Sequence, residues 1–136
     1  LTELGVDEIH LLSSSRSVVK WDARKSEQQR SRLARVAREA AMQSRQVKVP
    51  IIREMRDVLE ALSMFEGTLA HRGGSQLTLE RSTIYIGPEG GWALSEIADR
   101  PTVSLGPSVL RSETAAVTAG SALALLRADL LDNHSP

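Results

Sequence analysis

The residues best suited to chemistry lie in two glycine-rich loops. The first is Gly87–Gly91 (GPEGG), directly after the apolar stretch Thr83–Ile86, and the second is Gly106-Pro107, after Thr102–Leu105. Glycine lets the backbone approach a ligand closely and offer it N–H and C=O groups, which are well suited to reading adenine and ribose. In open α/β sheets, ligands bind outside the carboxyl ends of strands. The loops therefore predict a ligand site, although a tight turn alone would also explain the first.

Three polar side chains follow the second loop, at the expected start of the last helix: Arg111, Glu113 and Thr114. Arg111 could bind a phosphate or stabilise a developing anion. Glu113 could accept a proton or orient Arg111, and Thr114 could hydrogen-bond the ligand. The alternative is a helix N-terminus with a favourable acidic residue and no chemistry.

Several kinds of site are excluded or disfavoured. The nucleotide-phosphate patterns GxxxxGK[ST] and GxGxxG are absent. The chain has no cysteine, which excludes disulfides, thiolate metal sites and a cysteine nucleophile. Its histidines, His10, His71 and His134, match no metal-ligand spacing, so we expect no metal and place them on the surface or in turns.

The composition predicts one globular domain. The chain has 136 residues, of which 41% are hydrophobic and 25% charged. No apolar run approaches the roughly 18–20 residues of a membrane span, and the first residues show no secretion signal. With no cysteine, these features predict a cytoplasmic protein.

The formal net charge is zero, but the charges are segregated. From Arg16 to Arg56 there are 12 Lys and Arg residues against 4 Asp and Glu, whereas the rest of the chain has 5 and 13. Such segregation can create a positive face that attracts a polyanion. A solvated helix with arginines on its outer side would give the same count.

The order of elements predicts an α/β domain with a mainly parallel sheet. Strands are expected at Glu8–Leu12 (with Val18-Val19 able to extend the pairing), Ile51-Ile52, Leu62–Phe65, Thr83–Ile86 and Thr102–Leu105. Helices are expected at Lys25–Arg45, Arg56–Ala61, Ser95–Asp99 and Ser112 to about Leu131, with Ser95 and Ser112 as N-caps. Arg72–Gln76 is expected to be a loop. The spacing of five residues of the first helix predicts its buried face: Leu33, Val36, Ala37, Ala40 and Ala41.

The glycine loops and their flanks together resemble a known signature. IGPEGGW, followed by VSLGPSVLRSETAAVTAGSALALL, is similar to the motifs of the RsmE family, the 16S ribosomal RNA uridine-N3 methyltransferases of the SPOUT superfamily. Similarity to the family extends to Leu1–Val6, Arg16–Val18 and Glu39–Ser44, with Val49-Pro50 after the last of these. The resemblance thus covers nearly the whole chain.

Membership would imply a SPOUT-type mainly parallel sheet with helices on both faces and a C-terminal trefoil knot. It would also imply a homodimer whose interface lies beside a pocket for S-adenosylmethionine. Residues 1–136 would be the catalytic domain, and the family's N-terminal RNA-binding β-barrel domain would lie outside them. The partner would be 16S ribosomal RNA in the small subunit.

The resemblance also assigns residues. The S-adenosylmethionine pocket would be lined by Gly87, Glu89, Gly90, Gly91, Leu105, Gly106, Leu110 and Thr114. The catalytic residues would be Arg111 and Glu113. RNA would be bound by the basic segment, with Arg16, Arg30, Arg35 and Arg38 as candidates.

The chain departs from the family pattern in three ways beyond the absent domain. The spacing from Trp92 to Thr102 is short, and the stretch around residues 62–67 is thin for a strand that feeds the first loop. Met42 and Arg45 stand where Glu and Gly are expected. Ser108 replaces a usual Arg, which removes a positive charge near the RNA.

Two other functions fit the same residues. One is a different SPOUT methyltransferase, acting on a ribose 2′-hydroxyl or a tRNA base. The other is a non-catalytic RNA-binding relative that keeps the fold, although the intact run Arg111–Thr114 favours catalysis. The lack of cysteine agrees with N3 methylation, which needs no covalent adduct to the base.

Overall fold

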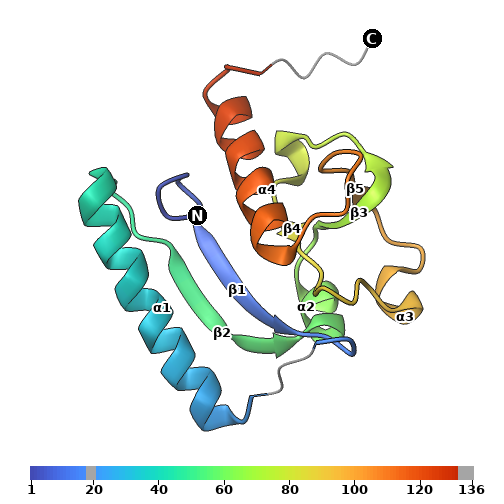
Figure 1. The fold of residues 1–136 in the computed structure, drawn as a ribbon, viewed down its shortest axis with the longest axis horizontal. Coiled ribbons are helices and arrows are strands. Elements are labelled where there is room, and N and C mark those ends of the chain that lie inside the picture. The colour runs from blue at the N-terminus through green and yellow to red at the C-terminus, as the bar shows by residue number, and fades with distance from the viewer. Residues whose placement is uncertain (18–20, 132–136) are drawn as a thin grey trace.

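The computed structural model describes residues 1–17 and 21–131 (Figure 1). In chain order its elements are β1 (Glu8–Ser13), α1 (Ala23–Ser44), β2 (Ile51–Asp57), α2 (Val58–Met64), β3 (Thr68–Ser75), η1 (Leu79–Arg81), β4 (Ile84–Tyr85), α3 (Leu94–Ile97), β5 (Thr102–Val103) and α4 (Ser112–Arg127). The predicted extension at Val18-Val19 lies outside the described residues, as does His134. Within the described ranges, no helix is both long and apolar enough to cross a membrane.

All strand pairs are parallel, which confirms the predicted α/β class. The strands form two sheets. In the first, β1 pairs with β2, with Glu8 opposite Ile51 and Ser13 opposite Asp57. In the second, β3 lies between β4 and β5. Figure 1 shows α1 along the outer side of β2 and α4 beside the second sheet.

Helix α1 confirms the prediction for residues 25–45, but its buried face is narrower than expected. Asp22 caps the helix by accepting a hydrogen bond from the backbone N–H of Lys25 at 2.8 Å. Ala37 and Ala41 are buried, whereas Val36 is 48% exposed. Consecutive residues point about 100° apart around a helix, so Val36 lies at the edge of a face centred near Ala37. Its assignment to the core was wrong.

The largest error concerns β3, which was predicted as a strand at Leu62–Phe65 followed later by a loop at Arg72–Gln76. Leu62 belongs to α2, and the strand is Thr68–Ser75, which includes two glycines and several polar residues. A Cβ at Gly74 would lie 2.6 Å from backbone atoms of Val103. Glycine therefore allows β5 to approach this strand closely, and strand propensity could not reveal the pairing.

The starts of the two short helices also differ from the prediction. Helix α2 begins at Val58, not Arg56, because the Asp57 carboxylate accepts the backbone N–H of Leu59 at 2.9 Å and serves as N-cap. Helix α3 begins at Leu94, with Ala93 as its N-cap, so the assignment of Ser95 as N-cap was wrong.

Helix α4 is shorter than predicted and is capped differently. It ends at Arg127, and Leu131 lies beyond it. Arg111 occupies the N-cap position and Ser112 is the first helical residue. The Ser112 hydroxyl donates a hydrogen bond to the carbonyl oxygen of Gly87 at 2.7 Å, so it is engaged across the fold and does not cap its own helix.

Two apolar clusters form the core. The first joins α2 to the second sheet and to the segment after β4: Val58, Ala61, Leu69, Tyr85 and Trp92. The second packs α4 against that sheet: Leu77, Val103, Ala119 and Leu126. The N-terminal turn also contacts α4, because a Cβ at Gly120 would lie 3.1 Å from Leu4.

Leu69 is fully buried in the middle strand of the second sheet. We expect Leu69→Ala to lower the free energy of unfolding by about 3 kcal/mol, because it removes a packed side chain and leaves a cavity. Leu59→Ala, on the half-exposed face of α2 (43%), should cost less than about 1 kcal/mol. Urea unfolding followed by circular dichroism measures both, and equal losses would contradict the central role of β3.

Candidate active site

The two glycine loops meet because β4 and β5 flank β3 in parallel. The loop Gly87–Gly91 follows β4, and the loop at Gly106 follows β5. Parallel strands have their carboxyl ends at the same edge of a sheet, so both loops leave that edge. The hydrogen bond from Ser112 to Gly87 then brings the start of α4 against the first loop. The structure thus gathers segments 87–91, 105–110 and 111–114 into one region.

The first glycine loop is anchored to β3 through Trp92, whereas its residues 89–91 are exposed. Gly91 has a φ of 70°, and its N–H donates to the carbonyl of Pro88 at 2.8 Å, which makes the turn tight. The buried Trp92 donates from its indole N–H to the Ala70 carbonyl of β3 at 3.0 Å. A Cβ at Gly87 would lie 3.1 Å from the Trp92 ring, so this anchor favours glycine there. Glu89, Gly90 and Gly91 remain exposed.

The second loop offers exposed backbone between apolar side chains. Gly106 has a φ of 126°, a conformation that side chains rarely allow. Ser104 holds the loop, since its hydroxyl lies 3.3 Å from the N–H of Gly106. Leu105 and Leu110 are half-buried on either side of the exposed residues 106–109. Apolar flanks around an exposed turn suit a flat heterocycle.

The predicted catalytic residues lie at the start of α4 with their side chains available. Arg111 and Glu113 are both exposed, and in the described part of the chain neither side chain forms a hydrogen bond or ion pair. Glu113 lies in the first turn of α4, where its charge is favourable. Thr114 is also exposed, one residue further along.

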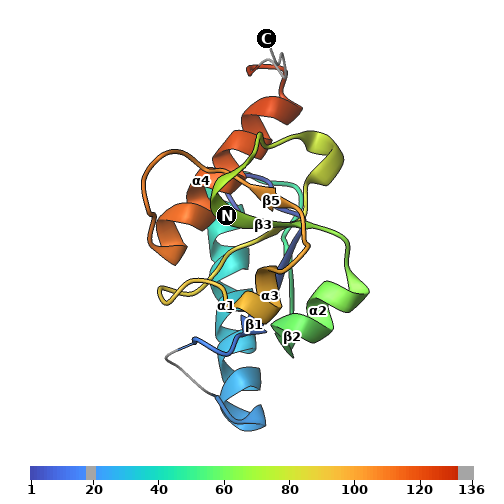
Figure 2. The same ribbon diagram turned by 90° about the vertical axis from the view of Figure 1, so that its right-hand side faces the viewer.

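The four candidate RNA-binding arginines do not form one group. Arg16 contacts the first glycine loop, where its Nη1 donates to the Gly90 carbonyl at 3.1 Å. The other three lie on α1, which Figure 1 shows on the far side of β2 from the second sheet and Figure 2 shows behind that sheet. Arg30 forms a two-pronged ion pair with Glu27, at 2.6 and 2.8 Å. Arg35 and Arg38 are exposed and, within the described residues, carry no ion pair. These last two are therefore the most available to a polyanion.

Glu96 is a buried acid close to the first glycine loop that the sequence did not reveal. Its side chain is 1% exposed. Burial raises its pKa, but hydrogen bonds from the backbone N–H groups of Ala93 and Ser15 and from the Ser15 hydroxyl lower it by more, so the net shift is downward. The carboxylate therefore stays ionised. The only signal in the sequence was its position in a short helix after the glycine loop, which does not distinguish a buried acid from an exposed one.

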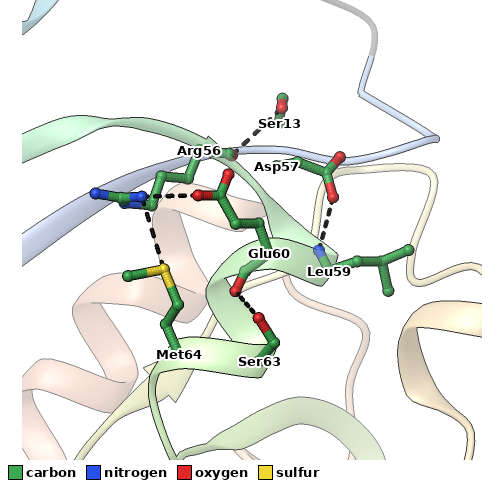
Figure 3. Close-up of polar contacts among 7 residues, drawn as sticks. All are labelled: Ser13, Arg56, Asp57, Leu59, Glu60, Ser63 and Met64. Carbon is green, nitrogen blue, oxygen red and sulfur yellow. Dashed lines mark hydrogen bonds and ion pairs between the residues drawn. The ribbon is translucent and has the colours of Figure 1, made fainter.

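A groove of about 780 Å³ lies at the carboxyl ends of β1 and β2 beside the start of α1, and its lining reaches Ser15 and Glu96. Its lining includes Arg30 and Arg56 but none of the predicted cofactor residues. Figure 3 shows the Arg56 guanidinium turned toward Glu60, at 2.8 Å, and toward the Met64 sulfur. Both arginines of the groove are thus paired with carboxylates, so the groove has little cationic charge left for a phosphate.

No group of three His, Asp or Glu side chains is arranged to hold a metal ion in residues 1–17 and 21–131. The surroundings of the glycine loops instead offer backbone groups, half-buried leucines and the side chains at the start of α4. The fold is that of an α/β domain with two glycine loops at the carboxyl edge of a parallel sheet, an arrangement typical of ligand-binding domains.

Comparison with known proteins identifies the family. Residues 1–124 match the model of the RNA methyltransferase domain family. The chain belongs to this family, and its resemblance to the RsmE family is confirmed.

Three of the similar proteins carry the same name, ribosomal RNA small subunit methyltransferase E. The ribosomal RNA small subunit methyltransferase E of Bacillus subtilis (strain 168) is 32% identical over 155 residues, which cover 94% of this chain and 60% of the relative. The protein of that name from Mycobacterium tuberculosis is 29% identical, over 92% of this chain and 55% of its own. A crystal structure of the Neisseria gonorrhoeae enzyme of that name, bound to S-adenosyl methionine, matches with a TM-score of 0.78 at 27% identity, over 92% of this chain and 57% of that one.

The chain spans 55–60% of the length of these curated relatives. The alignment with the Bacillus protein runs over 155 residues although this chain has 136, so the relative has residues within the aligned region that this chain lacks.

The contribution of the hydrogen bond from Ser112 to Gly87 can be measured as a change in the free energy of unfolding. Ser112→Ala removes the donor and leaves the Gly87 carbonyl without it, so we expect a loss of about 1 kcal/mol in the free energy of unfolding. Ser108→Ala, in the exposed part of the second loop, is the matched control and should leave stability unchanged. If both variants unfold at the same urea concentration as the wild type, α4 is not tied to the first loop by this bond.

Proposed function

We propose that this chain is the catalytic domain of an S-adenosylmethionine-dependent methyltransferase that modifies N3 of a uridine in 16S ribosomal RNA. The observation that carries the proposal is the contact between Ser112 and Gly87, at 2.7 Å. It places the Arg111–Thr114 run beside the loop that should hold the methyl donor. The names of the relatives, ribosomal RNA small subunit methyltransferase E, supply the substrate class.

The methyl donor is supported by the site and by the neighbour with bound S-adenosyl methionine. The exposed backbone of the two loops offers N–H and C=O groups to the adenine and ribose, between the half-buried Leu105 and Leu110. The open space at Gly91 and Gly106, where an added Cβ meets nothing within 4 Å, leaves room for a bound group. The residues proposed to hold the donor are Gly87, Glu89, Gly90, Gly91, Leu105, Gly106, Leu110 and Thr114.

The chemistry requires a nucleophile and a neutralised charge. S-adenosylmethionine, when bound, supplies an electrophilic methyl group on its sulfonium. Uridine N3 carries a proton and attacks only after losing it, which leaves a negative charge delocalised over the ring. We assign Arg111 to stabilise that charge. Glu113 takes the N3 proton or holds Arg111 in place, and the loops align the two substrates.

The RNA would be bound along the basic segment, outside the groove beside α1. Arg35 and Arg38 are exposed on α1: Arg35 points away from the buried Ala37 and Ala41, and Arg38 lies at the edge of their face. Arg16, at the first glycine loop, lies where RNA must arrive at the active site. Phosphate contacts of this kind supply affinity that falls steeply with salt.

The proposal also includes a C-terminal trefoil knot and a homodimer. We expect residues 1–136 to form one SPOUT catalytic domain with a C-terminal trefoil knot and to act in the cytoplasm. The β4-β3-β5 order and the return of α4 to the first loop support the knot. Val109 (81% exposed), Leu94 (84%) and Val117 (52%) are apolar and exposed around the site, which supports a homodimer whose interface lies beside it.

Arg111→Ala tests the catalytic assignment. It should lower the rate of methyl transfer to 16S ribosomal RNA about a hundredfold, because one group that stabilises transition-state charge is lost. The affinity for S-adenosylmethionine, measured by calorimetry, should stay within about twofold, since Arg111 is not assigned to the donor. Arg81→Ala, exposed before the amino end of β4, is the control. Nucleoside analysis of the product identifies the methylated atom, and a product other than N3-methyluridine would overturn the substrate assignment.

The double variant Arg35→Ala/Arg38→Ala tests the RNA-binding face. It should weaken RNA binding and reduce the slope of log affinity against log salt by about 1.4–1.8, the value for two lost phosphate contacts. Arg127→Ala, on α4 and paired with Asp7, should leave the slope unchanged. A slope unaltered by the double variant would make α1 a solvated face with no RNA contact.

A further inference from the structure

The buried carboxylate of Glu96 joins two segments that are 81 residues apart. Its Oε2 accepts a hydrogen bond from the backbone N–H of Ala93 at 2.7 Å. Its Oε1 accepts two more from Ser15, one from the backbone N–H and one from the hydroxyl, both at 3.0 Å. Burying a charged group is costly unless such partners are present. The carboxylate is therefore held by the loop after β1 on one side and by the start of α3 on the other.

The residue after Ser15 reaches the first glycine loop. Arg16 donates to the Gly90 carbonyl at 3.1 Å. A Cβ at Gly90 would lie 3.2 Å from the Arg16 Cβ, so the backbone of the loop packs closely against this side chain. Ser15 thus contacts α3, through Glu96, and Arg16 contacts the first glycine loop, through Gly90.

The contact matters because the two segments come from different sheets. Ser15 and Arg16 follow β1 of the first sheet, whereas the glycine loop follows β4 of the second. Gly90 is exposed and lies between the two tied ends of the loop, Gly87, which accepts from Ser112, and Trp92, which donates to Ala70. The contact from Arg16 is therefore a restraint on the exposed middle of the loop, which the two end contacts do not reach.

We propose that Glu96 is a positioning residue for the methyl-donor site. It fixes Ser15, which holds Arg16 against the Gly90 carbonyl and so sets the shape of residues 87–91. The inference rests on the proposed function, because it assigns those residues to the donor. Glu96 itself touches neither substrate, and it acts through Arg16.

Glu96→Gln is the first variant to make in the full chain. Glutamine keeps the size of the side chain, but its NH₂ group cannot accept a hydrogen bond. At least one of the present donors, in Ser15 or Ala93, therefore loses its acceptor. We expect S-adenosylmethionine to bind about tenfold more weakly, as for the loss of one hydrogen bond to a charged group. Glu66→Gln, an exposed acid before β3, is the matched control and should bind as the wild type does.

A double-mutant cycle separates positioning from a general loss of stability. If Glu96 acts through Arg16, Glu96→Gln should weaken donor binding in the wild type but add less than about twofold in the Arg16→Ala background. A merely structural role would lower the melting temperature and add the same factor in both backgrounds. Titrations are made well below the melting temperature of each variant, so that all are folded.

Ser15→Ala provides the same test should Glu96→Gln fail to fold, because it removes only the hydroxyl donor and keeps the backbone N–H. It should weaken donor binding by a few-fold, again only when Arg16 is present. Unchanged donor affinity in both variants, or effects independent of Arg16, would overturn the positioning role while the proposed function stands. A folded wild-type chain that binds no S-adenosylmethionine would remove both.

Discussion

The parallel pairing of β3 with both β4 and β5 is the constraint on which the rest of the structure depends. It sends the two glycine loops out of the same sheet edge, and it places Leu69 at the centre of the first apolar cluster. The pairing is possible because Gly74 lets the backbone of Val103 approach within a distance that no side chain would permit. The meeting of the two loops at this edge is therefore a consequence of strand order.

The loops themselves combine fixed ends with exposed middles. Trp92 ties the first loop to β3, and Ser112 ties the same loop to the start of α4. Each tie uses a side-chain donor and a backbone carbonyl, so the groups facing away from the protein stay available. Positioning by anchors outside the site suits a reaction in which two substrates must be aligned, since alignment supplies much of the rate.

Ion pairs reduce the positive charge that the basic segment can present to a polyanion. Residues 16–56 carry a large basic excess, but Arg30 is paired with Glu27, Arg53 with Glu8 and Arg56 with Glu60. The pairing with Arg53, and then with His10, holds the pKa of Glu8 at about 2, so that pair stays charged. The positive surface is therefore smaller than the count suggests; on α1 it includes the exposed arginines without an ion pair among the described residues: Arg24, Arg32, Arg35 and Arg38.

The sequence by itself determined the α/β class, the long helices and the two glycine loops with the Arg111–Thr114 run, because hydrophobic periodicity and glycine-rich turns are local properties of a chain. It also carried the family resemblance, which the comparisons confirmed. Tertiary structure alone decided that Thr68–Ser75 is the middle strand, that Val36 faces solvent, and that Ser112 bonds to Gly87 and does not cap its own helix. It alone buried Glu96 against Ser15. The physical reason is the same in each case: the partner that stabilises the residue lies far away in sequence, and neither propensity nor spacing contains information about it.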